Sequence, residues 1–192
     1  MDSTVRDEDG RTALHHTKGN VLHLLQQGID PNICDDGGWS PLMSAASSGD
    51  LIKVKNLIEF EKTDPNLQND SGCTALHYAC SKGFVEIVQA MLQKEGINLN
   101  VQDNSGKCTP IIRAMLAGHV RIVRMLKDAR AKLNNKDVEG NTVLHYAVAS
   151  ENVDLVVELI GAGALDGIKN HSNQTPLDIA SVFMRNRLEE EL

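Results

Sequence analysis

Two stretches of the chain place a histidine in almost the same setting. Residues 71–80 are SGCTALHYAC and residues 139–148 are EGNTVLHYAV, so both follow the pattern Gly-x-Thr-x-Leu-His-Tyr-Ala. His77 lies three residues before Cys80, and a cysteine–histidine pair is one way to build a covalent nucleophile. A catalytic motif is rarely written twice in one chain, however, so the duplication favours an architectural origin.

Other signatures of catalysis are missing from the sequence. It contains no Gly-x-Ser-x-Gly nucleophile elbow, no phosphate-binding loop and no His-x-x-x-His helix. The four cysteines show neither Cys-x-x-Cys pairs nor metal-ligand spacing. We therefore predict a protein that is not an enzyme and that uses no metal or cofactor.

Composition narrows the fold and the class of partner. Hydrophobic residues make up 41% of the 192 residues, but aromatic residues only 3%, which suits packing of small-residue helices better than a β-sandwich. The formal charge of −7 makes nucleic acid and anionic membranes poor partners, so protein partners are favoured.

The amino-terminal sequence MDSTVRDEDG is acidic and does not resemble a signal peptide. No segment approaches the roughly 18 consecutive apolar residues of a membrane span. We expect a soluble monomer of the cytoplasm and nucleus, with its cysteines as free thiols.

The elements that would position the two histidines recur along the chain. A Thr or Ser marks each unit with successive spacings of 28, 34, 35, 33 and 33, at Thr12, Ser40, Thr74, Thr109, Thr142 and Thr175. A second marker is spaced by 34 each time, at Asn32, Asn66, Asn100 and Asn134. Two independent markers at one period indicate a repeat array.

Each unit contains the signals of two helices. Thr or Ser can cap the first helix, and proline suits its first position, as at Pro41, Pro110 and Pro176. A core leucine follows at Leu14, Leu42, Leu76, Leu144 and Leu177, and the helix should end at Gly49, Gly83 and Gly118. A second helix is predicted by apolar periodicity in FVEIVQAMLQ, HVRIVRMLKD and NVDLVVELIG.

This pattern resembles the ankyrin repeat, whose period is about 33 residues and whose signature is Thr-Pro-Leu-His-x-Ala. The resemblance predicts one all-α solenoid domain over 1–192, with units of about 7–34, 35–68, 69–103, 104–136, 137–169 and 170–192. The first unit is about five residues short between His15 and Val21, and the fourth has an extra residue near Lys107 and Cys108. The last unit lacks the usual second-helix pattern and ends in RNRLEEEL, as a terminal cap would.

The resemblance also gives the histidines a structural role. In the family, the imidazole at the position of His15, His77 and His145 ties neighbouring loops together by hydrogen bonds. Cys80 replaces a small core alanine of the repeat, so we expect a packed and unreactive thiol.

Recognition then falls to the loop tips before each Thr or Ser and to the outward positions of the first helices, which we call the tip surface. Its candidate contacts are Asp9, Arg11, Asp36, Trp39, Ser44, Ser47, Asp70, Cys73, Tyr78, Lys82, Ser105, Lys107, Arg113, Glu139, Asn141 and Tyr146. Trp39 could be a binding hot spot or could pack over the neighbouring loop. Tyr78 and Tyr146 could contact a partner or cover neighbouring helices.

Charge is unevenly distributed along the array. Residues 107–136 contain eight Lys or Arg and one acid, Asp128, a sum of +7 that leaves −14 for the rest of the chain. Lys107 and Arg113 belong to the tip surface, whereas the cations from Arg121 to Lys132 are interpreted as a solvated helix face. A tip surface that is acidic at one end and basic near its middle would orient a partner of reverse polarity.

A narrower resemblance lies in the order of the tips. The runs are DGRTALH at 9–15, DDGGWSPL at 35–42, GCTALHYA at 72–79 and DVEGNT at 137–142. They resemble successive tips of the gankyrin family, the non-ATPase regulatory subunit 10 family of proteasome assembly chaperones. The element Asp-Asp-x-Gly-Trp-Ser-Pro-Leu is the most distinctive.

The resemblance implies binding to the C-terminal domain of one ATPase subunit of the 26S proteasome base, through charged pairs on the concave face. Matching positions are Asp9, Arg11, Asp36 and Trp39, with Arg113 as a further candidate. Arg11 is the strongest single candidate, as a bidentate partner for a carboxylate. The alternative is an ankyrin adaptor or inhibitor of another client, such as a kinase or a transcription factor.

The first unit departs from that family. The family begins with a further repeat, whereas this chain starts almost at the first tip, and its first unit is short. We expect a truncated member or a lost amino-terminal cap, with apolar surface exposed at Val21, Leu22 and Leu25.

Overall fold

The computed structural model describes residues 5–191, which form eleven helices and no strand. The predicted all-α solenoid is therefore confirmed. The helices are α1 (Ala13–His16), α2 (Leu22–Gln26), α3 (Pro41–Ser48), α4 (Leu51–Glu59), α5 (Ala75–Lys82), α6 (Val85–Met91), α7 (Pro110–Leu116), α8 (Val120–Asp128), α9 (Val143–Ala149), α10 (Val153–Gly161) and α11 (Val182–Glu191).

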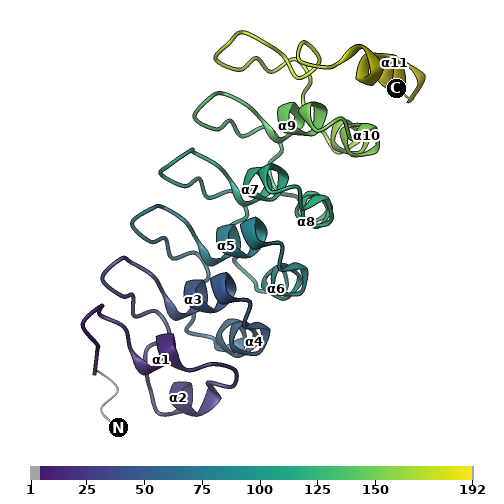
Figure 1. The fold of residues 1–192 in the computed structure, drawn as a ribbon. Coiled ribbons are helices and arrows are strands. Elements are labelled where there is room, and N and C mark those ends of the chain that lie inside the picture. Colours follow the sequence, from purple (N-terminus) through teal and green to yellow (C-terminus); the bar gives the residue numbers. More distant parts are fainter. Residues whose placement is uncertain (1–4, 192) are drawn as a thin grey trace.

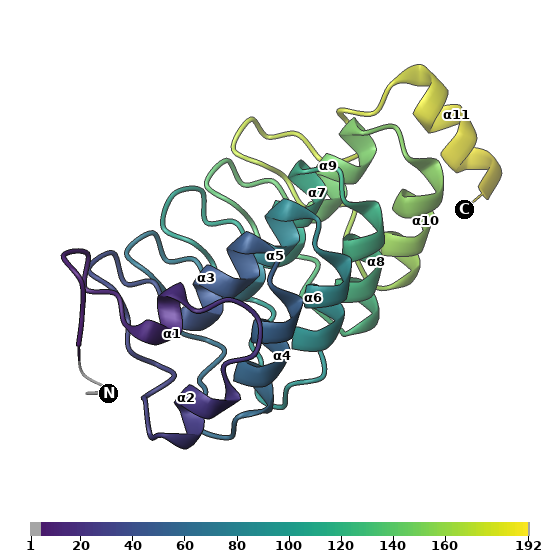
Figure 2. The same cartoon turned by 60° about the horizontal axis from the view of Figure 1, so that its bottom comes forward.

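The helices stack in two parallel rows. The first helices of consecutive units contact one another in the order α1, α3, α5, α7 and α9, and the second helices pack α4 on α6 and α6 on α8. Figure 1 shows the loop tips projecting to one side of the first helices, with the second helices on the other side. Figure 2 shows the same stack along its length, with α1 and α11 at opposite ends.

Local sequence explains where the first helices begin and end. Ser40 caps α3 by accepting a hydrogen bond from the Met43 N–H, and proline occupies the first position of α3 and α7. Gly49 and Gly83 end α3 and α5 in the left-handed conformation, as predicted. The core leucines Leu14, Leu42, Leu76 and Leu144 are at most 1% exposed.

The extra residue of the fourth tip changes which residue is left-handed. In the neighbouring tips a glycine takes positive φ, such as Gly72 at 71° and Gly140 at 81°. In the fourth tip that role passes to Lys107, at φ 54°, and Gly106 does not adopt positive φ. The insertion is therefore absorbed inside the loop, and the stacking of α5, α7 and α9 continues through it.

The last unit differs from the prediction. Thr175 to Ala180 form turns rather than a first helix, so Pro176 does not begin a helix and Leu177 is only half-buried. The second helix that the sequence appeared to lack is present as α11, which packs on α10 and buries Met184 and Leu188. These two buried residues lie four apart, on one side of the helix, whereas Val182 and Phe183 at its start are 74% and 59% exposed.

The expected apolar exposure in the first unit is also partly wrong. Leu22 is 38% exposed, but Val21 and Leu25 are at most 2% exposed. The Val21 N–H donates to Asn56 Oδ1 of α4, which holds the short first unit against the second. The first unit has short helices of four and five residues, and α2 still buries Leu24 and Leu25.

Candidate functional site

The repeat histidines connect each unit to the next. Nε2 of His15, His77 and His145 lies 2.9, 3.1 and 3.2 Å from the carbonyl oxygens of Trp39, Cys108 and Gln174 in the following tips. A carbonyl only accepts, so Nε2 carries the proton and donates. Nδ1 then accepts from the backbone N–H of the preceding threonine, at 3.0 to 3.1 Å.

These bonds leave no imidazole nitrogen free for chemistry. Burial lowers the pKa of His15, His77 and His145, so the rings are neutral at pH 7. Cys80 is fully buried, and burial raises the pKa of its thiol, so a reactive thiolate does not form. The structural interpretation of the duplicated motif is confirmed.

The fourth unit shows the consequence of lacking this histidine. Ile112 occupies the equivalent position, and the buried hydroxyl of Thr109 has no hydrogen-bond partner among residues 5–191. The neighbouring tips are still joined there, because the Val138 N–H donates to the Gly106 carbonyl at 2.8 Å.

The asparagines of period 34 perform the same task at the opposite end of the units. Asn66 donates through Nδ2 to the Gly96 carbonyl at 2.8 Å and accepts from the Asn98 N–H at 2.7 Å. Asn32 and Asn134 each make the corresponding pair of bonds to the next unit. The asparagine marker and the histidines that follow the threonine marker are therefore connectors between units.

The first residue of each tip shapes the loop, and the sequence analysis did not identify this role. Asp35 Oδ1 accepts from the N–H groups of Gly37 and Trp39, and Asp137 Oδ1 accepts from those of Glu139 and Asn141. The same position is held by Asp7, Asp35, Asn69, Asp103, Asp137 and Asn170. An Asp or Asn five or six residues before each Thr or Ser was the available signal.

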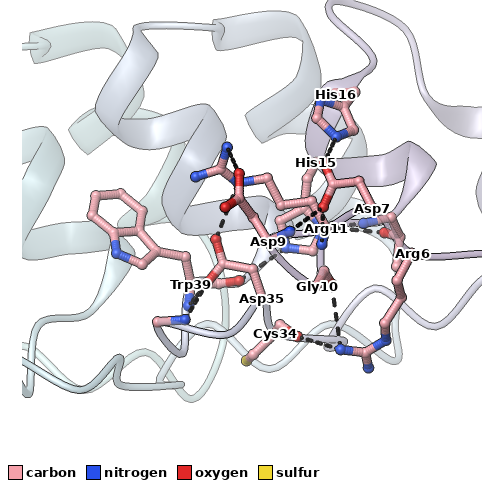
Figure 3. Close-up of polar contacts among 12 residues, drawn as sticks. Arg6, Asp7, Asp9, Gly10, Arg11, His15, His16, Cys34, Asp35 and Trp39 are labelled. Carbon is pink, nitrogen blue, oxygen red and sulfur yellow. Dashed lines mark hydrogen bonds and ion pairs between the residues drawn. The ribbon is translucent and has the colours of Figure 1, made fainter.

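The first two tips form a charged cluster (Figure 3). Arg11 pairs with Asp9 at 3.2 Å and with Asp35 at 3.3 Å, and its side chain remains 45% exposed. His16 lies 2.7 Å from Asp7 in the same cluster. Arg11 is thus accessible to a partner and already oriented by two carboxylates of its own chain. The Asp36 side chain beside this cluster is exposed.

Trp39 and Tyr78 form one aromatic feature across two units. Their rings stack with centroids 4.3 Å apart and planes inclined by 28°. The Tyr78 hydroxyl accepts from Asn69 Nδ2 at 2.6 Å, which fixes the ring that supports Trp39. Both side chains are half-buried, so the stack packs over the neighbouring unit and still presents an aromatic edge on the tip surface.

Several predicted contacts are engaged within the chain. Arg113 donates through Nε to Asp103 at 2.8 Å, and its Nη2 lies 2.7 Å from the same carboxylate, which has no exposed surface. Nη2 also donates to the Ser105 hydroxyl at 2.9 Å. The Tyr146 hydroxyl donates to Asp137, and burial together with this bond raises the pKa of Tyr146 to about 12. Cys73 is 7% exposed and has little surface to offer a partner.

The remaining candidates keep their polar ends in solvent or at the edges of the tips. Asn141 is half-buried and bonds to Glu139 at 3.2 Å and to Asn170 of the next tip at 2.9 Å. Besides Arg11, the exposed candidates are Asp9, Asp36, Asp70, Lys82, Ser105, Lys107 and Glu139. The exposed acids therefore belong to the first three tips and the fifth, and Lys107 supplies a cation in the fourth.

Some of the cations in residues 107–136 form ion pairs between helices rather than facing only solvent. Arg124 and Lys127 of α8 both pair with Glu158 of α10, each at 2.9 Å. Arg121 is exposed on α8, as predicted for a solvated helix face, whereas Lys132 is exposed but lies in the loop after α8. These pairs lie on the second helices, away from the tip surface.

Within residues 5–191, no group of three or more metal-binding side chains is present. In the same residues, no helix combines the length and hydrophobicity needed to cross a bilayer. All four cysteines are free thiols.

Comparison with known proteins assigns the repeats. The family described as "Ankyrin repeats (3 copies)" matches residues 17–103 and 45–137, and "Ankyrin repeat" matches residues 139–171. The chain belongs to the ankyrin-repeat family. Ankyrin repeats are typically non-catalytic protein-interaction scaffolds, and the match indicates protein partners.

Individual ankyrin-repeat proteins resemble the chain to different extents. It is 47% identical to the 26S proteasome non-ATPase regulatory subunit 10 of Dictyostelium discoideum over 62 residues, which cover 29% of this chain and 26% of that protein. It is 32% identical to neurogenic locus notch homolog protein 1 of Homo sapiens over 182 residues, covering 91% of this chain and 6% of that protein. The chain thus corresponds to a minor part of either relative.

Solved structures share the architecture. The ankyrin repeat domain of Bcl-3, a member of the IkappaB protein family, superposes with a TM-score of 0.81 at 24% identity, covering 98% of this chain and 85% of that one. The ankyrin repeat protein EF0377 gives a TM-score of 0.75 at 26% identity, covering 88% of this chain and 90% of that one. The Bcl-3 likeness concerns the fold alone.

Proposed function

We propose that this ankyrin-repeat protein is an assembly chaperone for the proteasome regulatory particle. It binds the C-terminal domain of one base ATPase subunit on its tip surface and holds that subunit during assembly. The proposal includes action as a monomer in the cytoplasm and nucleus.

The observation that carries this proposal is the sequence of the successive loop tips and their order, which resemble those of the gankyrin family. The 47% identity to proteasome subunit 10 over 62 residues supports it. Framework residues of the repeat account for the shared Thr, Leu and His positions, but not for Trp39 or for the charged residues around it. Arg11 and Trp39 border one region of the tip surface, where an oriented guanidinium and an aromatic edge lie next to exposed Asp9 and Asp36. Aromatic and arginine side chains are the residues most often found as interface hot spots.

A second candidate is an adaptor or inhibitor that binds another class of client, such as a kinase or a transcription factor. The observation that favours it is the extent of the likeness to notch homolog protein 1, which covers 91% of this chain. The same tip surface would serve, because recognition depends on side chains that the repeat framework leaves free.

Calorimetric titration with the isolated C-terminal domains of the six base ATPase subunits separates the two candidates. We expect one domain to bind, with binding lost in Arg11→Glu and retained in Arg121→Glu. The second change reverses the same charge on the exposed face of α8, so it controls for net charge. Circular dichroism should first establish that both variants keep the helical content of the wild type.

If none of the six domains binds, the proteasome proposal is rejected and the adaptor is favoured. Binding of several domains with similar affinity, unaffected by Arg11→Glu, would indicate charge-driven association elsewhere on the molecule.

A further inference from the structure

The shortened first unit opens a pocket on the tip surface. Helix α1 makes a single turn, whereas α3 and α5 each contain eight residues. Beside it lies a pocket of about 460 Å³, lined among others by Arg11, Lys18, Trp39, Ser44, Ser47 and Lys53. We call it the Lys53 pocket. It occupies the region next to α1 and along the tip-facing side of α3.

Lys53 is an unusual residue for its place in the repeat. It belongs to the second helix α4, at the position taken by Ile87, Ile122 and Leu155 in later units, all of which are at most 2% exposed. Lys53 is itself only 3% exposed. Burying an ammonium group is costly unless hydrogen bonds and counter-charges compensate, so this substitution of a core aliphatic residue requires an explanation.

The chain itself compensates Lys53 only in part. Nζ donates to the carbonyl oxygen of His15 at 3.0 Å, near the end of α1, and this is one of the three hydrogen bonds that an ammonium can donate. The charge of nearby Asp50 offsets part of the burial, but within residues 5–191 it forms no ion pair with Lys53 Nζ, and its carboxylate accepts from the backbone N–H groups of Lys53 and Gly19. Burial lowers the pKa of Lys53 to about 8, so the group remains mostly charged at pH 7.

The rest of the pocket favours an anion. Asp35, the other acid of the lining, is engaged by Arg11 and by two backbone N–H groups. Arg11 and Lys18 stand at the exposed rim, and Ser44 and Ser47 supply hydroxyl groups from α3. Trp39 provides an apolar wall for the methylene groups of a side chain.

We propose that the Lys53 pocket binds an acidic side chain of the protein partner, with the carboxylate paired to Lys53 and its stem against Trp39. The inference rests on the proposed function only in that the partner is a protein. The pocket adjoins Arg11 and Trp39, so one partner segment can occupy it and contact the first two tips together. A carboxylate that reaches Lys53 completes a charge-assisted hydrogen bond inside a largely desolvated site.

The test is a titration of the whole chain with acetylated, amidated tetraglutamate, followed through the backbone amide NMR signals, and with tetraglutamine as the matched neutral peptide. We expect shifts concentrated at Gly19, Ser47 and Lys53 with the glutamate peptide only. In Lys53→Met the dissociation constant should rise about tenfold or more. Lys55→Met removes an equal charge from an exposed position of the same helix and should leave binding unchanged.

A second variant keeps the proposal testable if Lys53→Met does not fold. Ser47→Asp leaves Lys53 in place and puts a competing carboxylate in the pocket, so binding of tetraglutamate should be lost. The proposal is overturned if Lys53→Met or Ser47→Asp binds like the wild type, if tetraglutamine gives the same shifts, or if the shifts centre on the cations of α8.

These outcomes are independent of the ATPase titration. If none of the six ATPase domains binds but tetraglutamate still binds, the proteasome partner is rejected and the proposal for the Lys53 pocket is retained. Binding of one ATPase domain with no effect of Lys53→Met on its affinity would retain the partner and reject the pocket as part of the interface.

Discussion

Replacing Arg113 with methionine separates a structural arginine from a partner-binding one. Asp103 has no exposed surface, and Arg113 forms an ion pair with its carboxylate in which Nε donates a hydrogen bond at 2.8 Å. Methionine keeps most of the apolar stem and removes only the guanidinium. The carboxylate would then be left with the Gly106 N–H at 2.8 Å and the Ser105 hydroxyl at 3.2 Å.

The loss of stability can be bounded from this geometry. Removing one partner of a fully buried ion pair costs about 3–5 kcal/mol. The Arg113 side chain is 32% exposed, so water can reach the vacated site, and two hydrogen bonds to Asp103 remain. We therefore expect the free energy of unfolding to fall by about 2–3 kcal/mol. The control is Arg124→Met, whose pair with Glu158 is well exposed, and which should cost about 0.5–1 kcal/mol.

Urea unfolding at pH 7, followed by circular dichroism, measures both variants. Burial alone would raise the pKa of Asp103, but the Gly106 N–H and the Arg113 guanidinium outweigh it and lower that pKa. The lowered pKa means that the stabilisation by ionised Asp103 is present at neutral pH and is lost as pH falls through the folded-state pKa. The gap between wild type and Arg113→Met should narrow on acidification. Equal stability of Arg113→Met and Arg124→Met at pH 7 would refute the reasoning, and lost partner binding at unchanged stability would restore Arg113 as a contact.

Three further predictions concern the connections between units. His77→Ala leaves the Thr74 N–H and the Cys108 carbonyl without their partner, so the free energy of unfolding measured in urea should fall by about 2–4 kcal/mol. A variant as stable as the wild type would contradict the connecting role of the ring. Burial lowers the pKa of the three repeat histidines below their ordinary value of 6.5, so the unfolded chain takes up protons first, and stability should fall as pH drops below about 6.5; denaturation midpoints that are constant between pH 7.5 and 5 would exclude this linkage. Backbone amides of the first unit, with helices of four and five residues, should exchange with solvent faster than those of the third to fifth units, and hydrogen exchange showing uniform protection would be inconsistent with the expected weakness of that unit.

The sequence alone was sufficient for the repeat and for the helices of its inner units, and the resemblance to the ankyrin repeat implied the role of the histidines. These features are encoded within one period: a cap, a core leucine and a glycine at fixed offsets specify a helix locally. Because His15, His77 and His145 each lie three residues after the threonine of their unit, the three rings make equivalent contacts. Prediction was weakest in the first and last units, because fewer neighbours there constrain the pattern, as α11 and the buried Val21 show.

Only the tertiary structure shows which polar side chains already have hydrogen-bond or ion-pair partners within the chain. Arg11 and Arg113 are both predicted partner contacts, and each pairs with a carboxylate that is 6% exposed or less, Asp35 and Asp103. Arg11 alone also pairs with an exposed acid, Asp9. Likewise, Trp39 finds its support in Tyr78 of the next unit, and Lys53 reaches the carbonyl of His15, 38 residues away. Periodicity determines which surface a residue faces, whereas its partners depend on how neighbouring units pack, which no single period of sequence contains.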